Sequence, residues 1–200
     1  MASPQPGFPS FDGRSFEGQL LVASPNMFDP FFSRSVVYVL AHNREGAQGL
    51  ILNRPTDFEW PPDLGLPGPL GSEPAAIYDG GPVLRDSLSF VAFVSPDAHV
   101  PGFSPMPGHA GKAGLGFIEV DHWTDEAVTA LARSRIFIGF SGWEGGQLEG
   151  EILTDSWIVV DGGSDDVFTS DPASLWHAVL DRQGGKLARI ASMPEDVRMN

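Results

Sequence analysis

Residues Arg135–Glu151 read R-I-F-I-G-F-S-G-W-E-G-G-Q-L-E-G-E, and this stretch decides how we interpret the rest of the chain. Ile136–Phe140 is an apolar run typical of a strand, Ser141–Gly146 is rich in small residues, and Gln147 begins a short helical pattern. A strand, a turn and a helix with a serine at the turn is where a hydrolase would keep a nucleophile. It is also an ordinary way for a strand to lead into a helix. The stretch alone leaves both interpretations of its serine open.

The composition is that of one globular domain with many turns. The chain has 200 residues, 42% of them hydrophobic, with 24 glycines and 18 prolines. This length allows a single domain with a real core, and the many chain breakers predict short elements. The sequence contains no cysteine, so disulfides and thiolate chemistry are excluded. Residues 1–12 lack the features of a signal peptide, and no run approaches the ~18 apolar residues of a membrane span. We therefore expect a cytoplasmic protein without membrane contact.

The net charge is strongly negative. Lys and Arg total 12 against 26 Asp and Glu, which gives −14 at pH 7. A duplex-DNA binder places several basic side chains against phosphates, so this balance argues against direct nucleic-acid binding. Protein or small-ligand partners fit the composition better, and the sequence carries no signal for an oligomeric state.

The order of elements predicts a single α+β domain. Residues 1–17 read as a flexible lead, residues 18–193 as the domain and residues 194–200 as a C-terminal tail. Hairpin-connected strand patterns dominate, and two to three helices flank them. We expect strands at 19–24, 35–42, 47–53, 75–78, 88–95, 115–120, 136–140 and 157–160, and helices after the caps Thr124 and Asp171 and at 186–193. These elements predict a curved, largely antiparallel sheet.

Three blocks in a fixed order resemble a known family. The first is L-L-V-A-S-P-N-M-F-D-P-F-F-S-R-S-V-V-Y-V-L-A-H-N-R-E-G-A-Q-G-L-I-L-N-R-P at Leu20–Pro55, the second is Y-D-G-G-P at Tyr78–Pro82, and the third is G-F-S-G-W-E-G-G-Q-L-E-G-E-I at Gly139–Ile152. Together they resemble the YqgE/AlgH family, also called UPF0301 or DUF179. The resemblance implies a bacterial single-domain protein whose bifurcated sheet folds into a pseudo-barrel. It implies no established catalytic activity, and one branch of the family carries a transcriptional-regulator label. The Pro-rich segment Thr56–Pro74 departs from the family pattern, since many members have a longer segment there.

Ser141 is the candidate nucleophile of the alternative interpretation, a serine hydrolase. Gly139–Trp143 is one residue short of G-x-S-x-G, because a tryptophan stands where the second glycine would let the helix pack closely. A triad would need His177 as base, with Asp155, Asp161 or Asp171 as its orienting carboxylate. His177 follows Trp176 on an amphipathic helix pattern, where a structural histidine is the commoner finding. We therefore expect Trp143 to fill the core and the serine to serve the geometry of the chain.

A polar cluster is the most plausible ligand pocket that the sequence suggests. Asp29 and Arg34 lie in the loop before one strand, Asn53 ends the next strand, and Gly80 and Gly81 offer backbone groups. Loop residues within a family motif often serve binding, although they can equally serve turn geometry. Further candidates come from the quoted stretch, namely Ser141, Trp143 and Glu149.

The sequence predicts no metal and no cofactor. The five histidines show no metal-ligand spacing, and Gly80-Gly81-Pro82 lacks the lysine and hydroxyl of a phosphate loop. In the helix that begins at Gln147, Gln147 and Glu151 share a face at i, i+4 while Glu149 points elsewhere. With no complete catalytic set, we expect a non-enzymatic binding or regulatory module that acts through protein or small-ligand contacts.

Overall fold

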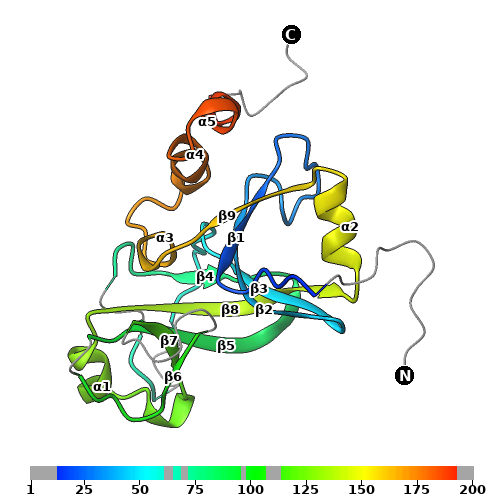
Figure 1. Cartoon of the computed structure of the whole chain (residues 1–200). Helices are drawn as coiled ribbons and strands as arrows, with labels where there is room; N and C mark the ends of the chain where they lie inside the picture. The colour runs from blue at the N-terminus through cyan, green and yellow to red at the C-terminus, as the bar shows by residue number, and fades with distance from the viewer. Residues whose placement is uncertain (1–12, 61–64, 69–71, 96–97, 107–113, 193–200) are drawn as a thin grey trace.

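The computed structural model describes residues 13–60, 65–68, 72–95, 98–106 and 114–192 (Figure 1). Most of the predicted lead, residues 1–12, and the predicted tail, residues 194–200, lie outside the described residues. The strands are β1 Gln19–Ala23, β2 Val36–Asn43, β3 Gly46–Ile51, β4 Ile77–Asp79, β5 Val83–Phe93, β6 Phe103–Pro105, β7 Leu115–Ile118, β8 Arg133–Glu144 and β9 Trp157–Asp161. The α-helices are α1 Asp125–Ala130, α2 Gln147–Leu153, α3 Ser164–Val167, α4 Leu175–Asp181 and α5 Gly185–Ala191, and a 3-10 turn covers Val120–His122.

One nine-stranded sheet organises the molecule, and β8 is its central strand (Figure 1). The strand order is β6-β7-β5-β8-β3-β2-β1-β9, and β4 pairs with β8 beside this path. Every pairing is antiparallel except that of β4 with β8, which is parallel. The α+β class and the curved, largely antiparallel sheet are therefore confirmed. The described residues hold five short α-helices, more than the two to three expected, because α2 and α3 add to the three helices predicted after Thr124, after Asp171 and at 186–193. The acidic segment after β9 forms α3 instead of a plain turn.

The sheet forks where β4 enters. Residues 141–144 of β8 pair directly with β3, with Gly49 opposite Ser141. Residues 136–138 of β8 pair instead with β4, which lies between β8 and β3 there. Gly80 joins the two branches, because its N–H donates to Ile138 O (2.8 Å) and its carbonyl accepts from Ile51 N (3.0 Å). A Cβ on Gly80 would lie 2.4 Å from Gly139 O, so only a glycine allows this approach. This fork is the bifurcation that the family resemblance implies.

β8 runs further than the sequence indicates. We expected a turn from Ser141 onward, but the strand continues to Glu144 and only Gly145 and Gly146 turn into α2. Gly139 adopts φ +67 and interrupts the alternation of side chains between the two faces of the strand. Phe137 and Phe140 therefore both pack on the same core cluster. This interruption lets the strand continue across the fork, and it places the serine in the strand instead of at a turn.

Three apolar clusters hold the elements together. The largest, which includes Tyr38, Phe137 and Trp176, packs the inner side of the sheet against α3, α4 and α5. A second cluster lies under α2 and contains Trp143 and Trp157. A third, around Trp123, packs β5, β7 and β8 with the α1 region. Phe16 also packs into the second cluster, so the described end of the N-terminal lead is fixed to the domain.

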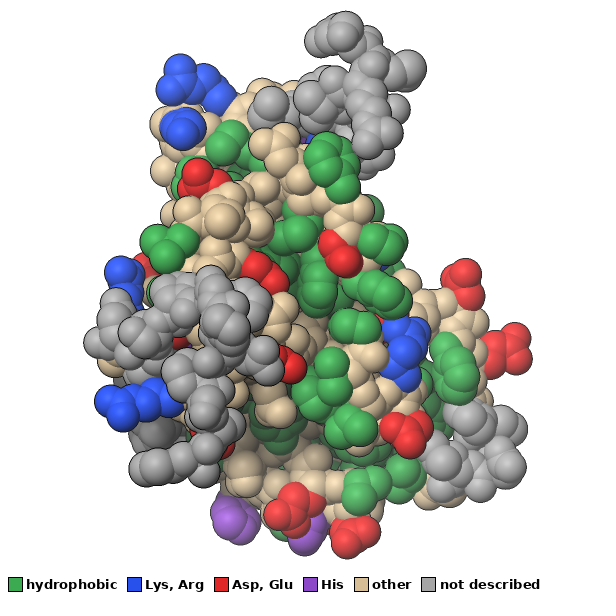
Figure 2. Space-filling model, turned by 90° about the vertical axis from the view of Figure 1, so that its right-hand side faces the viewer, with side chains coloured by type: hydrophobic (Ala, Val, Ile, Leu, Met, Phe, Trp, Pro, Cys, Tyr) green, Lys and Arg blue, Asp and Glu red, His purple; other side chains and the backbone are tan. Residues whose placement is uncertain are grey.

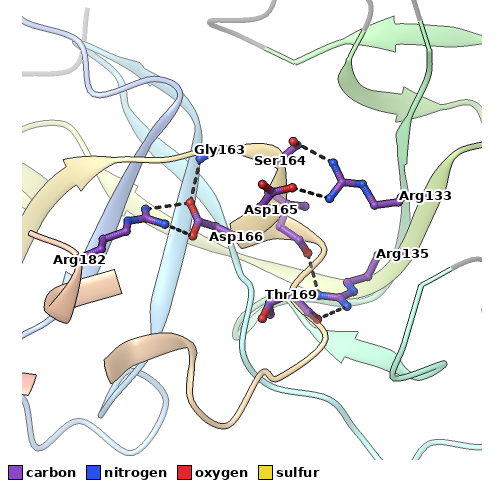
Figure 3. Close-up of polar contacts among 9 residues, drawn as sticks. Arg133, Arg135, Gly163, Ser164, Asp165, Asp166, Thr169 and Arg182 are labelled. Carbon is purple, nitrogen blue, oxygen red and sulfur yellow. Dashed lines mark hydrogen bonds and ion pairs between the residues drawn. The ribbon is translucent and has the colours of Figure 1, made fainter. Parts of the chain in front are cut away.

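Arginines attach the α3 segment to the sheet and to α4 (Figure 3). Arg135 is buried and donates to Val167 O (2.7 Å) and Thr169 O (2.8 Å), while Arg133 donates to Asp165 Oδ1 (2.7 Å). Arg182 binds both oxygens of Asp166, and Asp166 Oδ2 also accepts from Gly163 N (2.9 Å). Burial lowers the pKa of Arg135 to about 10, so its guanidinium remains charged at neutral pH.

None of the described helices has the length and hydrophobicity that a membrane crossing requires. Figure 2 shows the side of the molecule that carries α2, where hydrophobic side chains gather along the middle and acidic side chains are scattered among them. Exposed hydrophobic residues in this part of the chain include Phe28 and Phe31 before β2 and Leu153 in α2.

Candidate functional site

A small cavity of about 220 Å³ lies where the loop before β2, the end of β3 and α4 meet. We call it the basic pocket, and its lining residues are Ser33, Arg34, Asn53, Arg54, Ala173, Trp176 and His177. It therefore brings together two of the predicted site residues, Arg34 and Asn53. Two arginines and no carboxylate line it, although the whole chain carries a net charge of −14.

Asn53 fixes the backbone of this pocket. Its Oδ1 accepts from Val36 N (3.0 Å), and its Nδ2 donates to Arg34 O (2.9 Å). Both ends of the amide are therefore bound to the backbone on either side of the β2 start. An amide is suited to this position because it supplies a donor and an acceptor from one side chain. Asn53 is thus a positioning residue for Arg34.

Arg34 has an unusual backbone conformation. Its φ is +57, in the left-handed region that non-glycine residues rarely occupy. Its guanidinium lies 4.1 Å from the centre of the Trp176 ring, in a cation–π contact. The residue is half-buried, and it lines the pocket. A left-handed arginine costs of order 1–3 kcal/mol, so the surrounding contacts must hold this conformation.

Arg54 and His177 complete the polar wall. Arg54 NH2 donates to Ser33 O (2.8 Å), which holds the guanidinium beside the loop before β2. His177 Nδ1 lies 2.6 Å from Ala191 O. A carbonyl can only accept, so Nδ1 carries the proton and Nε2 of the neutral ring is an acceptor. The ring packs edge-on against Trp176, with centroids 5.0 Å apart.

The other predicted residues do not line this pocket. Asp29 Oδ1 accepts from Phe31 N (2.8 Å) and Phe32 N (3.2 Å), so it shapes its own loop. Gly80 and Gly81 are at the fork of the sheet, where a Cβ on either would collide with the backbone of β8. The expected grouping of Asp29, Arg34, Asn53 and the two glycines in one pocket is therefore wrong.

Ser141 is a fully buried residue of the fork. Its hydroxyl donates to Gly80 O (3.1 Å), and its exposed fraction is 0%. His177, the base that the sequence suggested, lines the basic pocket and contacts Ala191 instead. The hydrogen bond to Gly80 links β8 to the β4 branch, so the serine hydroxyl connects two parts of the sheet.

Trp143 and Glu149 belong to the packing around α2. Trp143 Nε1 (2.9 Å) and Trp157 Nε1 (2.7 Å) both donate to Glu151 Oε2, and Gln147 Nε2 donates to Glu151 Oε1 (2.9 Å). The expected i, i+4 pairing of Gln147 with Glu151 is confirmed. Glu149 points elsewhere, and its Oε1 lies 3.3 Å from Nε2 of the buried His42. These contacts anchor α2 to β2, β8 and β9.

The sequence did not place five of the lining residues in the basic pocket: Ser33, Arg54, Ala173, Trp176 and His177, the last of which it suggested only as a triad base. Arg54 is adjacent to a chosen residue, and its position just after a strand was an available signal. Trp176 and His177 come from a helix more than a hundred residues away, and no local pattern predicts that contact. Within the described ranges, no group of three His, Cys, Asp or Glu side chains is placed to hold a metal ion.

Comparison with known proteins assigns the chain to a family. The family model described as AlgH-like (DUF179) matches residues 20–188. A UPF0301 protein of Thermobifida fusca is 39% identical over 193 residues, covering 94% of this chain and 98% of its own length. A UPF0301 protein of Streptomyces avermitilis is 38% identical over 186 residues, covering 93% of this chain and 96% of its own.

Two solved structures share the fold. A crystal structure of a Corynebacterium diphtheriae protein superposes with a TM-score of 0.77 at 23% identity, over 90% of this chain and 94% of that one. The solution structure of the AlgH protein of Pseudomonas aeruginosa, a UPF0301 protein, gives a TM-score of 0.62 at 26% identity, over 97% and 98% of the two chains. The order and spacing of the three sequence blocks, the forked sheet and these relatives agree, and the chain belongs to the AlgH-like family, UPF0301.

Proposed function

We propose that residues 18–193 act as a cytoplasmic binding module that captures an oxyanion group, a phosphate or a carboxylate, in the basic pocket without catalysing a reaction on it. The observation that carries this proposal is the left-handed Arg34, held by Asn53 and stacked on Trp176. A glycine would adopt this backbone conformation at lower cost. The use of an arginine there supports a role for its side chain.

The chemistry of the pocket matches an oxyanion. Guanidinium groups bind carboxylates and phosphates through paired N–H donors, and Arg34 and Arg54 line the same cavity. Its volume of about 220 Å³ is below the ~300–1,000 Å³ of sites that enclose a drug-sized ligand. The pocket therefore suits an oxyanion group of a larger molecule, on a small ligand or on a protein partner, rather than a whole nucleotide.

Calorimetric titration of the full chain with inorganic phosphate and with succinate tests the proposal. We expect one or both anions to bind, and we expect Arg34→Gly and Arg54→Gln each to weaken binding by about tenfold or more, the loss typical of a charged hydrogen bond. Arg85→Gln is the matched control, since Arg85 is an exposed arginine paired with Asp79 outside the pocket. If neither anion binds at millimolar concentration, or if all three variants behave alike, the proposal is wrong.

The competing function is a serine hydrolase that uses Ser141. A fluorophosphonate probe separates the two functions, because it labels activated serines only. Labelling of the parent chain that is lost in Ser141→Ala would overturn the binding-module proposal. The regulator label of one family branch is tested separately by a gel shift at low salt, where we expect no duplex-DNA binding because of the net charge.

A further inference from the structure

A second cavity lies at the opposite end of the β2–β3 hairpin. It has a volume of about 670 Å³, and we call it the hairpin cavity; its lining residues are Ala41, Asn43, Glu45, Gly46, Ala47, Gln48, Phe140, Gly142, Trp143, Glu144 and Gln147. We propose that this cavity binds a small organic cation with an apolar body. This inference is independent of the oxyanion site, which uses none of these residues.

Gly142 is the residue that opens the cavity. A Cβ there would meet only the Val83 Cγ2 at 3.4 Å and the Phe140 Cε2 at 3.7 Å, which are ordinary contacts, and its φ is not in the left-handed region. The other described strand glycines differ: a Cβ on Gly46, Gly49, Gly116 or Gly139 would lie within 2.1–2.6 Å of neighbouring atoms. The backbone therefore requires those four glycines but does not require Gly142.

A glycine weakens a strand where neither the backbone conformation nor a close neighbouring atom requires it. It leaves no side chain to pack and it costs conformational entropy, and such a residue often marks a place where a ligand approaches closely. At Gly142 the missing side chain leaves room beside the half-buried ring of Phe140, on the face of β8 opposite to Trp143. Ala41, another small residue, also lines the cavity, two strands away across Gln48. The ring of Phe140 and these two small residues suit an aliphatic or aromatic body.

The rim of the cavity favours a positive charge. Glu45 and Glu144 are exposed carboxylates at its edge, and neither Lys nor Arg lines it, although Arg44 lies in the adjoining turn. Gln48 adds an amide to the wall, while the amide of Gln147 is bound to Glu144 N (3.0 Å) and Glu151 Oε1 (2.9 Å). The volume of about 670 Å³ lies within the usual range for small-molecule sites.

A matched pair of probes tests this proposal, namely 2-phenylethylamine and phenylacetate, which share an aromatic body and differ in the sign of the charge. The full chain, labelled with nitrogen-15, is titrated with each probe while the amide signals of Gly142 and Gln48 are followed. We expect the amine to shift these signals saturably and the carboxylate to leave them unchanged. Equal response to both probes, or no response to the amine, would overturn the proposal.

Two variants separate the hollow from the charge. Gly142→Val fills the hollow, and we expect at least about tenfold weaker binding of the amine together with an unchanged or higher melting temperature. Glu45→Gln with Glu144→Gln should retain the fold because both side chains are exposed, and we expect roughly two- to fivefold weaker binding with less dependence on salt, as for exposed ion pairs. A large fall in melting temperature for both Gly142→Val and Gly142→Ala would show that the glycine serves the backbone, which contradicts the proposal.

Discussion

The two ends of the β2–β3 hairpin are built in opposite ways. At the open end, Asn53 binds Arg34 O and Val36 N and holds a left-handed conformation that an arginine adopts at a cost. At the turn end, the cavity arises because Gly142 has no side chain where one would fit. One site is made by adding specific side chains and the other by leaving one out. The two ends therefore respond differently to substitution, and that difference can be measured.

The largest effect is expected for Asn53→Leu. The leucine has a similar size but leaves Val36 N and Arg34 O without their partner, and each unsatisfied group costs ~1–3 kcal/mol. We expect the free energy of unfolding to fall by about 3 kcal/mol in urea denaturation, together with loss of anion binding. Asn43→Ala at the turn end is the matched control. Asn43 is exposed and caps only Glu45 N (2.7 Å), so its loss should cost less than about 1 kcal/mol. Equal costs at the two asparagines would contradict the comparison.

Two glycines of neighbouring strands give the next effect. A Cβ on Gly49 would lie 2.6 Å from Val37 Cγ1 and 2.8 Å from Tyr38 O, so Gly49→Ala must displace β2 and should cost about 2 kcal/mol. Gly142→Ala meets no such obstacle and should change the free energy of unfolding by no more than about 1 kcal/mol, in the stabilising direction. Thermal unfolding of the two variants side by side measures the difference, and a destabilising Gly142→Ala would remove the distinction between them.

The sequence predicted the framework better than the sites. Three predictions follow from local rules and are confirmed: the hairpin connection between the strands expected at 35–42 and 47–53, the cap at Thr124, whose side chain accepts from Ala127 N, and the buried Trp143. The prediction that Ser141 lies in a turn was wrong, because the strand kinks at Gly139, which adopts a positive φ, and then continues through Ser141. The sequence indicated only Arg34 and Asn53 of the basic pocket, because these two residues flank one hairpin. Trp176 reaches the pocket through a long-range contact, which no local pattern predicts.

The core between the two ends should remain dry, and alkaline titration tests this. Tyr38 is 1% exposed in the middle of β2, opposite Leu50, and burial raises its pKa to about 12. A raised tyrosine pKa means that this contribution to stability is complete below the unfolded pKa of 10.0 and is lost as the pH rises through about 12. We expect a loss of about 1–2 kcal/mol over that interval. Tyrosinate absorbance should appear only as the chain unfolds, and Tyr38→Phe should reduce the loss; tyrosinate formation in the folded chain near pH 10.0 would show that water reaches the core.

Ser141→Ala should give the smallest effect, because it touches the fork that separates the two ends without opening either site. The hydroxyl donates to Gly80 O, but that carbonyl also accepts from Ile51 N, so no buried group is left without a partner. A single lost hydrogen bond of this kind costs about 1 kcal/mol or less. Phosphate and 2-phenylethylamine should both bind the variant as they bind the parent chain, since the serine lines neither cavity. Weaker binding of either probe would mean that the fork transmits strain to that end of the hairpin, and that the two ends are coupled through β8 instead of being built independently.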